Sequence, residues 1–182
     1  RDTHILWVGT RSGLNRFDKT TGKAIRYYHD PKNPESLDSN YIWQILEDVK
    51  DPNILWILPF QKGLEKFDKR TGRISHFRHD PENNQSLGSF QAAGMIQDRN
   101  NPHILWVGTI DNGLDRFDKR DETFTHYPPD PGNPNAFQGG PIIDLYDDGN
   151  GTLWLCGLVA NNGLTLFKKD NQLFTTFRHN PG

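Results

Sequence analysis

The stretch LWVGTRSGLNRFDKTTG, from Leu6 to Gly22, returns three more times along the chain in altered form. The later copies are LWILPFQKGLEKFDKRTG (55–72), LWVGTIDNGLDRFDKRDE (105–122) and LWLCGLVANNGLTLFKKDN (153–171). The glycine of the GL pair recurs at intervals of 50 residues, at Gly13, Gly63, Gly113 and Gly163. A fixed period of this length indicates a repeat protein in which each copy folds into one structural unit.

Each repeat contains four candidate strands, which are clearest in the second repeat. The segments YIWQILED (41–48), GLEKFD (63–68) and ISHFRHD (74–80) alternate, and ILWIL (54–58) is a short continuous apolar run. Turn-forming residues separate them, and no ten-residue stretch has helical apolar spacing. The sequence therefore predicts an all-β fold. We expect a β-propeller fragment with about four blades of four antiparallel strands, the first blade being incomplete.

The repeat frame places a single partial propeller domain at residues 1–182. We expect a partial blade at 1–35 and full blades at 36–85, 86–135 and 136–182. The first blade starts at its second strand and lacks the innermost one. Propellers close with about 4–8 blades, so we expect a piece of a longer propeller. Its exposed sheet edge predicts contact with the remaining blades or self-association, which a monomeric mass in light scattering would contradict.

Composition narrows the choice of partners. The chain has 21 Lys and Arg against 23 Asp and Glu, so no basic excess favours nucleic acid. Its apolar runs are too short to span a bilayer, and we expect no membrane contact by this region. The single cysteine, Cys156, excludes an internal disulfide, and its place in LWLCG predicts a small buried residue.

The polar residues that recur from copy to copy favour structural roles. Asp18, Asp68 and Asp118 open the turns between the third and fourth strands. The segment DDGNGT (147–152) predicts a tight hairpin, since it lacks the carboxylate spacing of a calcium loop. We expect the histidines of the last strands to lie far apart, which disfavours a zinc site. The sequence thus predicts no catalytic residues, no metal and no cofactor; the histidines are His29, His76, His79, His126 and His179.

The loops that vary between copies are the candidate binding surface. They connect the second and third strands or lead into each first strand, and blade topology places both sets on one face of the ring. Their polar groups would hydrogen-bond sugar hydroxyls, and their aromatic rings would stack on the apolar face of a sugar. Neutral drift in exposed loops is the alternative explanation for any one of them. The candidate ligand-binding residues are Arg11, Tyr41, Phe60, Gln61, Phe90, Gln91, Asp111, Asn112, Asn161 and Asn162.

The run from Leu6 to Asp48 resembles the two-component regulator propeller repeat, and the resemblance extends over essentially all of the chain. LWILP and LWLCG depart from the LWVGT pattern, and GLTLFKK lacks the aspartate of the other copies. The resemblance implies a ligand-sensing region that lies outside the bacterial cytoplasm, in the periplasm. It also implies fusion through a membrane helix to a histidine kinase, often a hybrid one, or to another signalling output. In polysaccharide-utilising members the ligand is an oligosaccharide.

The sequence is consistent with three functions. The leading hypothesis is a non-enzymatic sensor that binds an oligosaccharide and biases an attached output domain. A protein-interaction scaffold would use the blade face or rim instead. A carbohydrate-active propeller enzyme is the third, since DPNILW and NPHILWVG are similar to segments of xyloglucan-hydrolysing propellers. A hydrolase needs two carboxylates across a cleft, and Asp111 is the only acidic residue in the loops between second and third strands.

Overall fold

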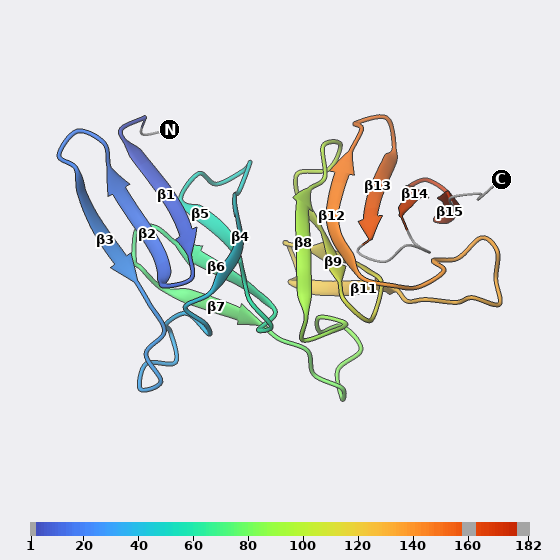
Figure 1. Ribbon diagram of the computed structural model, residues 1–182, viewed down its shortest axis with the longest axis horizontal. Helices are drawn as coiled ribbons and strands as arrows, with labels where there is room; N and C mark the ends of the chain where they lie inside the picture. Colours follow the sequence, from blue (N-terminus) through green and yellow to red (C-terminus); the bar gives the residue numbers. More distant parts are fainter. Residues whose placement is uncertain (1–2, 158–162, 178–182) are drawn as a thin grey trace. The chain divides into compact units, whose positions relative to one another are not determined.

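The computed structural model describes residues 3–157 and 163–177, and every regular element within these ranges is a β-strand. The chain divides into two compact units, Arg1–Phe77 and Arg78–Gly182, each of which contains two antiparallel sheets. Consecutive strands pair in chain order within every sheet (Figure 1). The predicted all-β fold, with one three-stranded and three four-stranded sheets, is confirmed.

The first unit contains the three-stranded sheet and one complete sheet. The three-stranded sheet consists of β1 (Ile5–Thr10), β2 (Gly13–Asp18) and β3 (Lys23–Tyr27). The second sheet consists of β4 (Ile42–Glu47), β5 (Ile54–Pro59), β6 (Leu64–Asp68) and β7 (Ile74–Phe77). Every residue of β5 is buried, as expected for a continuous apolar run flanked by strands on both sides.

The second unit contains two complete sheets. The third sheet consists of β8 (Ala92–Gln97), β9 (Ile104–Thr109), β10 (Leu114–Asp118) and β11 (Thr123–Tyr127). The fourth sheet consists of β12 (Ile142–Asp147), β13 (Thr152–Gly157), β14 (Leu164–Lys168) and β15 (Leu173–Phe177). Among the described residues no helix is long and apolar enough to cross a membrane.

The repeated tryptophan and phenylalanine hold neighbouring sheets together within each unit. Trp7 on β1 meets Phe67 on β6 edge to face, with ring centroids 5.3 Å apart. Trp106 on β9 meets Phe167 on β14 in the same geometry at 5.4 Å. Both phenylalanines are fully buried. The repeat therefore encodes the contact between one blade and the next, because large aromatic rings bury much apolar area and favour tilted packing.

Cys156 is exposed, so the prediction that it is buried was wrong. On β13 the buried face belongs to Leu153 and Leu155, and strand alternation turns Cys156 to the opposite face of the sheet.

Candidate ligand-binding site

The same backbone hydrogen bond brings the two sets of variable loops together in the second and third sheets. The amide of Phe60, just after β5, donates to the carbonyl of Tyr41, just before β4, at 2.8 Å. In the third sheet Ile110 donates in the same way to Gln91 at 3.0 Å. The loop after the second strand thus lies beside the entry to the first strand, as predicted, and its side chains differ from blade to blade.

A β-bulge re-aims one side chain in each first strand. The pairing of β4 with β5 shifts between Ile42 and Gln44, which leaves Trp43 as the extra residue. The other two complete sheets shift at Ala93 and Ile143. Bulges commonly turn a side chain out of the regular alternation. In the second sheet alone among these three, the re-aimed residue is a tryptophan, and it is 47% exposed.

Trp43 joins two other rings in a cluster that we call the aromatic platform, defined as Tyr41, Trp43 and Phe60. The rings of Tyr41 and Phe60 are stacked, with centroids 4.8 Å apart and planes 21° apart. Trp43 lies 6.0 Å from Phe60 and 6.1 Å from Tyr41. Because Phe60 is 40% exposed as well, the platform offers aromatic surface to solvent.

Arg11 adds a positive charge beside the aromatic platform. Its guanidinium lies 5.0 Å from the centroid of the Tyr41 ring, within the range of a cation–π contact. Arg11 also borders a pocket of about 460 Å³ in the same unit. The residues that line this pocket are Arg11, Ser12, Arg26, Tyr28 and Asn40.

This arrangement suits a flat, partly apolar ligand that carries many hydroxyl groups. Exposed ring faces bury the C–H face of a sugar, while the neighbouring guanidinium and amide groups supply hydrogen-bond donors. Arg11 and Arg26 would also pair with a carboxylate or sulfate on such a ligand, since guanidinium binds planar anions in two-point contacts.

The structure gathers part of the predicted set. Arg11, Tyr41 and Phe60 belong to the cluster just described, and Gln61 follows Phe60, exposed and in the left-handed region at a φ of 58°.

The remaining described members lie in the second unit. Phe90 is 58% exposed and packs edge to face on His79 at 4.9 Å. Gln91 and Asn112 are half-buried and Asp111 is exposed, and Ala93 and Ile110 take the places of Trp43 and Phe60 in this blade. Asn161 and Asn162 lie outside the described residues.

Sequence reasoning missed Trp43, although the chain contained a signal for it. Four of the five tryptophans follow the repeat, and Trp43 is the fifth. A large exposed aromatic residue that breaks an otherwise regular repeat needs a separate explanation, and a ligand-binding role supplies one.

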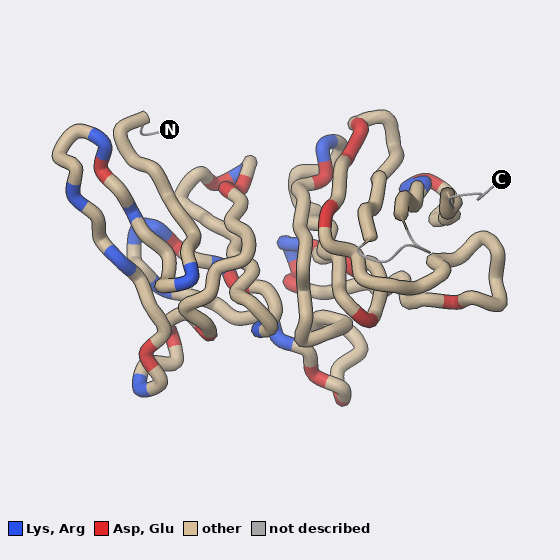
Figure 2. The backbone as a smooth tube through the Cα atoms, in the orientation of Figure 1, with Lys and Arg blue, Asp and Glu red and all other residues tan. Residues whose placement is uncertain are grey.

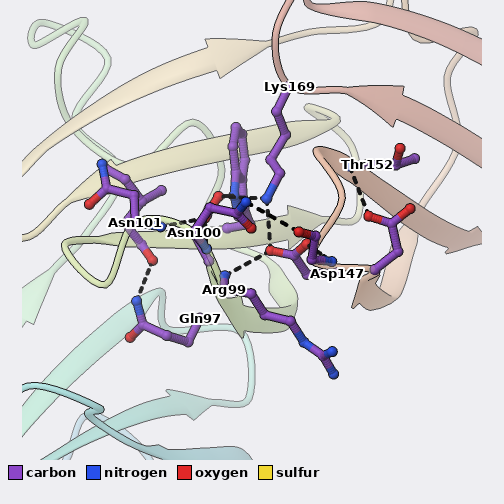
Figure 3. Close-up of polar contacts among 12 residues, drawn as sticks. Gln97, Arg99, Asn100, Asn101, Asp147, Thr152 and Lys169 are labelled. Carbon is purple, nitrogen blue, oxygen red and sulfur yellow. Dashed lines mark hydrogen bonds and ion pairs between the residues drawn. The ribbon is translucent and has the colours of Figure 1, made fainter.

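At the opposite end of the blades the repeated polar residues form structural networks (Figure 3). The Lys169 ammonium lies 2.8 Å from Asp147 Oδ2 and 3.0 Å from Asp98 Oδ2, so it links the ends of β12 and β8. Asp98 also accepts a hydrogen bond from the Trp106 indole at 2.7 Å. Burial disfavours the charged lysine, but its hydrogen bonds to the two carboxylates outweigh this and raise the pKa of Lys169. These contacts join the third and fourth sheets.

The aspartates that open the constant turns also act within the fold. Asp118 Oδ1 accepts the backbone amide of Arg120 at 3.1 Å, and the Arg120 guanidinium lies 2.6 Å from Asp118 Oδ2. The guanidinium hydrogen bond lowers the pKa of Asp118 to about 2. Asp68 makes the same contacts with Arg70, and its pKa is also about 2.

A carboxylate–histidine pair fastens the long loop before β8 onto the third sheet. His126 Nδ1 lies 2.7 Å from Asp115 Oδ1, and His126 Nε2 lies 3.0 Å from the carbonyl of Asn84. Asp115 Oδ2 accepts the amide of Gly88 at 2.7 Å. Both ring nitrogens face acceptors, which favours the doubly protonated imidazolium. The hydrogen bond that His126 donates to Asp115 accordingly raises the pKa of His126 above its usual 6.5.

This pair predicts a loss of stability at alkaline pH. Because the pKa of His126 is raised on folding, its contribution is complete below pH 6.5 and disappears as the pH rises through the folded-state value. We expect the melting temperature of the wild type to fall over this window, and His126→Gln to lose that part of the fall. Thermal melts between about pH 5 and pH 9 measure both slopes. Parallel slopes for the two proteins would contradict the assignment.

A scan against protein-family models found no match, and a search of curated proteins found none either. Solved structures give clear likenesses. The extracellular domain assigned to the hybrid two-component system BT3049 of B. thetaiotaomicron superposes with a TM-score of 0.85 at 24% identity, over 100% of this chain and 24% of that one. The corresponding domain of BT4673 from the same organism gives 0.74 at 19% identity, over 100% and 22%.

More distant propellers share the architecture. The WD40 repeats of RRP9 superpose with a TM-score of 0.68 at 10% identity, over 97% of this chain and 48% of that one. The chain therefore has the β-propeller fold, as predicted, and matches the propellers of two-component extracellular domains. It spans about a quarter of the length of those extracellular domains.

Proposed function

We propose that this chain is the ligand-binding part of an extracytoplasmic sensor and that it recognises an oligosaccharide at the aromatic platform. The observation that carries the proposal is the exposed cluster of Tyr41, Trp43 and Phe60 with Arg11 beside it. The similar propellers are extracellular domains assigned to two-component systems, which supports a sensor rather than an isolated binding protein. Occupancy of the platform would bias an attached output domain, such as a histidine kinase.

The side chains of the aromatic platform and of the adjacent pocket support binding without catalysis. Figure 2 shows basic and acidic residues interspersed along the described backbone of both units. The residues of the platform and of the adjacent pocket carry no carboxylate, whereas glycoside hydrolysis ordinarily requires a pair of them. A stacking surface whose own residues carry no carboxylate supports binding over glycoside hydrolysis.

The test is a thermal-shift screen of this chain against neutral oligosaccharides and oligosaccharides that contain uronic acid, followed by calorimetry. We expect a saturable rise in melting temperature with one structural group of sugars. If the ligand is acidic, Arg11→Gln should weaken it more than it weakens a neutral analogue. A folded protein that responds to no sugar in the panel would contradict oligosaccharide binding by this chain and would favour a protein partner at the platform.

A further inference from the structure

The strand β1 pairs with a neighbour along one edge only. In the three-stranded sheet it pairs with β2, and no strand of the described residues pairs with its other edge. All residues of β5 and β9, the corresponding strands of the second and third sheets, are buried, whereas those of β1 are half-buried or exposed. An unpaired strand edge presents backbone donors and acceptors to another extended segment.

The third sheet shows what kind of segment fits this edge, because β1 and β9 have the same sequence, ILWVGT. There β8 pairs antiparallel with β9 and is followed at once by Asp98. The amide of Asp98 donates to the carbonyl of Ile104 at 3.0 Å. Ile5 is the equivalent residue of β1, so its carbonyl offers the same acceptor to a strand of the β8 type.

Two donors from different strands hold the carboxylate of Asp98 in the third sheet. The indole of Trp106 donates to Asp98 Oδ2 at 2.7 Å, and the Lys169 ammonium lies 3.0 Å from the same oxygen (Figure 3). Lys169 also binds Asp147, at the end of the first strand of its own sheet, at 2.8 Å. The aspartate after a first strand therefore fastens that strand both to its neighbour in the sheet and to the next sheet.

The first unit contains the same two donors. Trp7 on β1 corresponds to Trp106, and Lys69 after β6 corresponds to Lys169. Lys69 lies 6.0 Å from the Trp7 ring and binds Glu47, at the end of the first strand of its own sheet, at 2.7 Å. Within the part of the chain that the structure describes, the Trp7 indole N–H has no hydrogen-bond acceptor. The place that Asp98 takes in the third sheet thus has its donors but no aspartate among the described residues.

These donors border a pocket of about 550 Å³ in the first unit. Ile5 and Trp7 line it together with two cations, Arg16 and Lys69. Among the described residues that line the pocket, Glu47 is the one carboxylate, and Lys69 already binds it. An indole N–H beside two cations favours an acidic group as the occupant.

We propose that the open edge of β1 binds one further antiparallel strand, an extended segment of six residues followed at once by an aspartate. The strands β4, β8 and β12 all have this form. The amide of the incoming aspartate would donate to the Ile5 carbonyl, and its carboxylate would accept from Trp7 and Lys69. This contact fixes the register, because a slip by one residue would move the carboxylate away from both donors.

A synthetic peptide with the sequence of residues 90–100 tests the edge, because it contains β8 and Asp98. We expect calorimetry to show saturable binding of one peptide per chain. The same peptide with Asp98→Asn should bind at least about tenfold more weakly, since it keeps the side-chain shape but loses the charge. In the chain, Trp7→Phe keeps a ring against Phe67 but removes the N–H, so the difference between the two peptides should narrow.

Three results would overturn the proposal. The first is no saturable binding of the unmodified peptide, and the second is equal affinity of the two peptides for the wild-type chain. The third is a difference between the peptides that Trp7→Phe leaves unchanged, which would place the peptide elsewhere. Sedimentation of the chain with and without peptide completes the test: a stable dimer that excludes the peptide would assign the edge to a second copy of the chain and contradict the proposal.

Discussion

Replacing Trp43 with alanine is expected to weaken binding of the responsive oligosaccharide by at least about tenfold. The indole is 47% exposed, and the β-bulge of β4 places it beside Phe60. Burying one aromatic face under a sugar contributes on the order of 2 kcal/mol, and 1.4 kcal/mol corresponds to a factor of ten in affinity. Calorimetric titration of both proteins measures the difference.

Tyr146→Ala is the control for this substitution. Tyr146 on β12 is 54% exposed and has a cation–π contact with Arg99 at 5.5 Å, but it does not belong to the aromatic platform. We expect the melting temperature of Tyr146→Ala and its affinity for the oligosaccharide to stay close to those of the wild type. An equal loss of affinity in the two variants would assign the effect to general surface change and not to the platform.

The largest expected effect on stability comes from Gly113→Ala. Gly113 opens the GL pair with a φ of 80°, a region that residues with a Cβ rarely adopt. An added Cβ would lie 2.4 Å from the carbonyl oxygen of Tyr127 and 3.1 Å from Phe137. Strain and clash together should cost about 3 kcal/mol, a fall in melting temperature of about 6–12 °C. Differential scanning calorimetry measures this fall.

Gly22→Ala separates the backbone strain at positive φ from the steric clash of the added Cβ. Gly22 also has a positive φ, 68°, but nothing lies within 4 Å of its added Cβ. Gly22→Ala should lose only the free energy of placing a Cβ at positive φ, about 1–2 kcal/mol. If both variants lost the same stability, the close packing of Gly113 against Tyr127 and Phe137 would not be the reason for the repeated glycine.

The fold was predictable because the contacts that build it repeat with the sequence. The predicted second-repeat strand 41–48 is observed as Ile42–Glu47, and the predicted 74–80 as Ile74–Phe77. Trp7 and Trp106 pack between neighbouring sheets as expected. Strand ends were overestimated where polar residues continue the alternation into a turn.

The site was only partly predictable, because its key residue depends on an irregularity. Strict alternation placed Trp43 on the same side as Ile45 and Glu47. The bulge between Ile42 and Gln44 breaks that alternation, so Ile45 packs against the core while Trp43 is exposed. The variable loops did indicate Arg11, Tyr41 and Phe60, but their mutual contacts depend on the backbone frame that joins Phe60 to Tyr41.

Tryptophan fluorescence of the wild type and of Trp43→Phe, during titration with the responsive oligosaccharide, tests the central claim most directly. Phenylalanine keeps an aromatic face, so calorimetric affinity should stay within a few-fold of the wild type. The other tryptophans belong to the repeat, and Trp56 and Trp106 are buried. The account predicts that the fluorescence change disappears in the variant while binding persists. An undiminished fluorescence change in Trp43→Phe would place the ligand elsewhere and contradict the account.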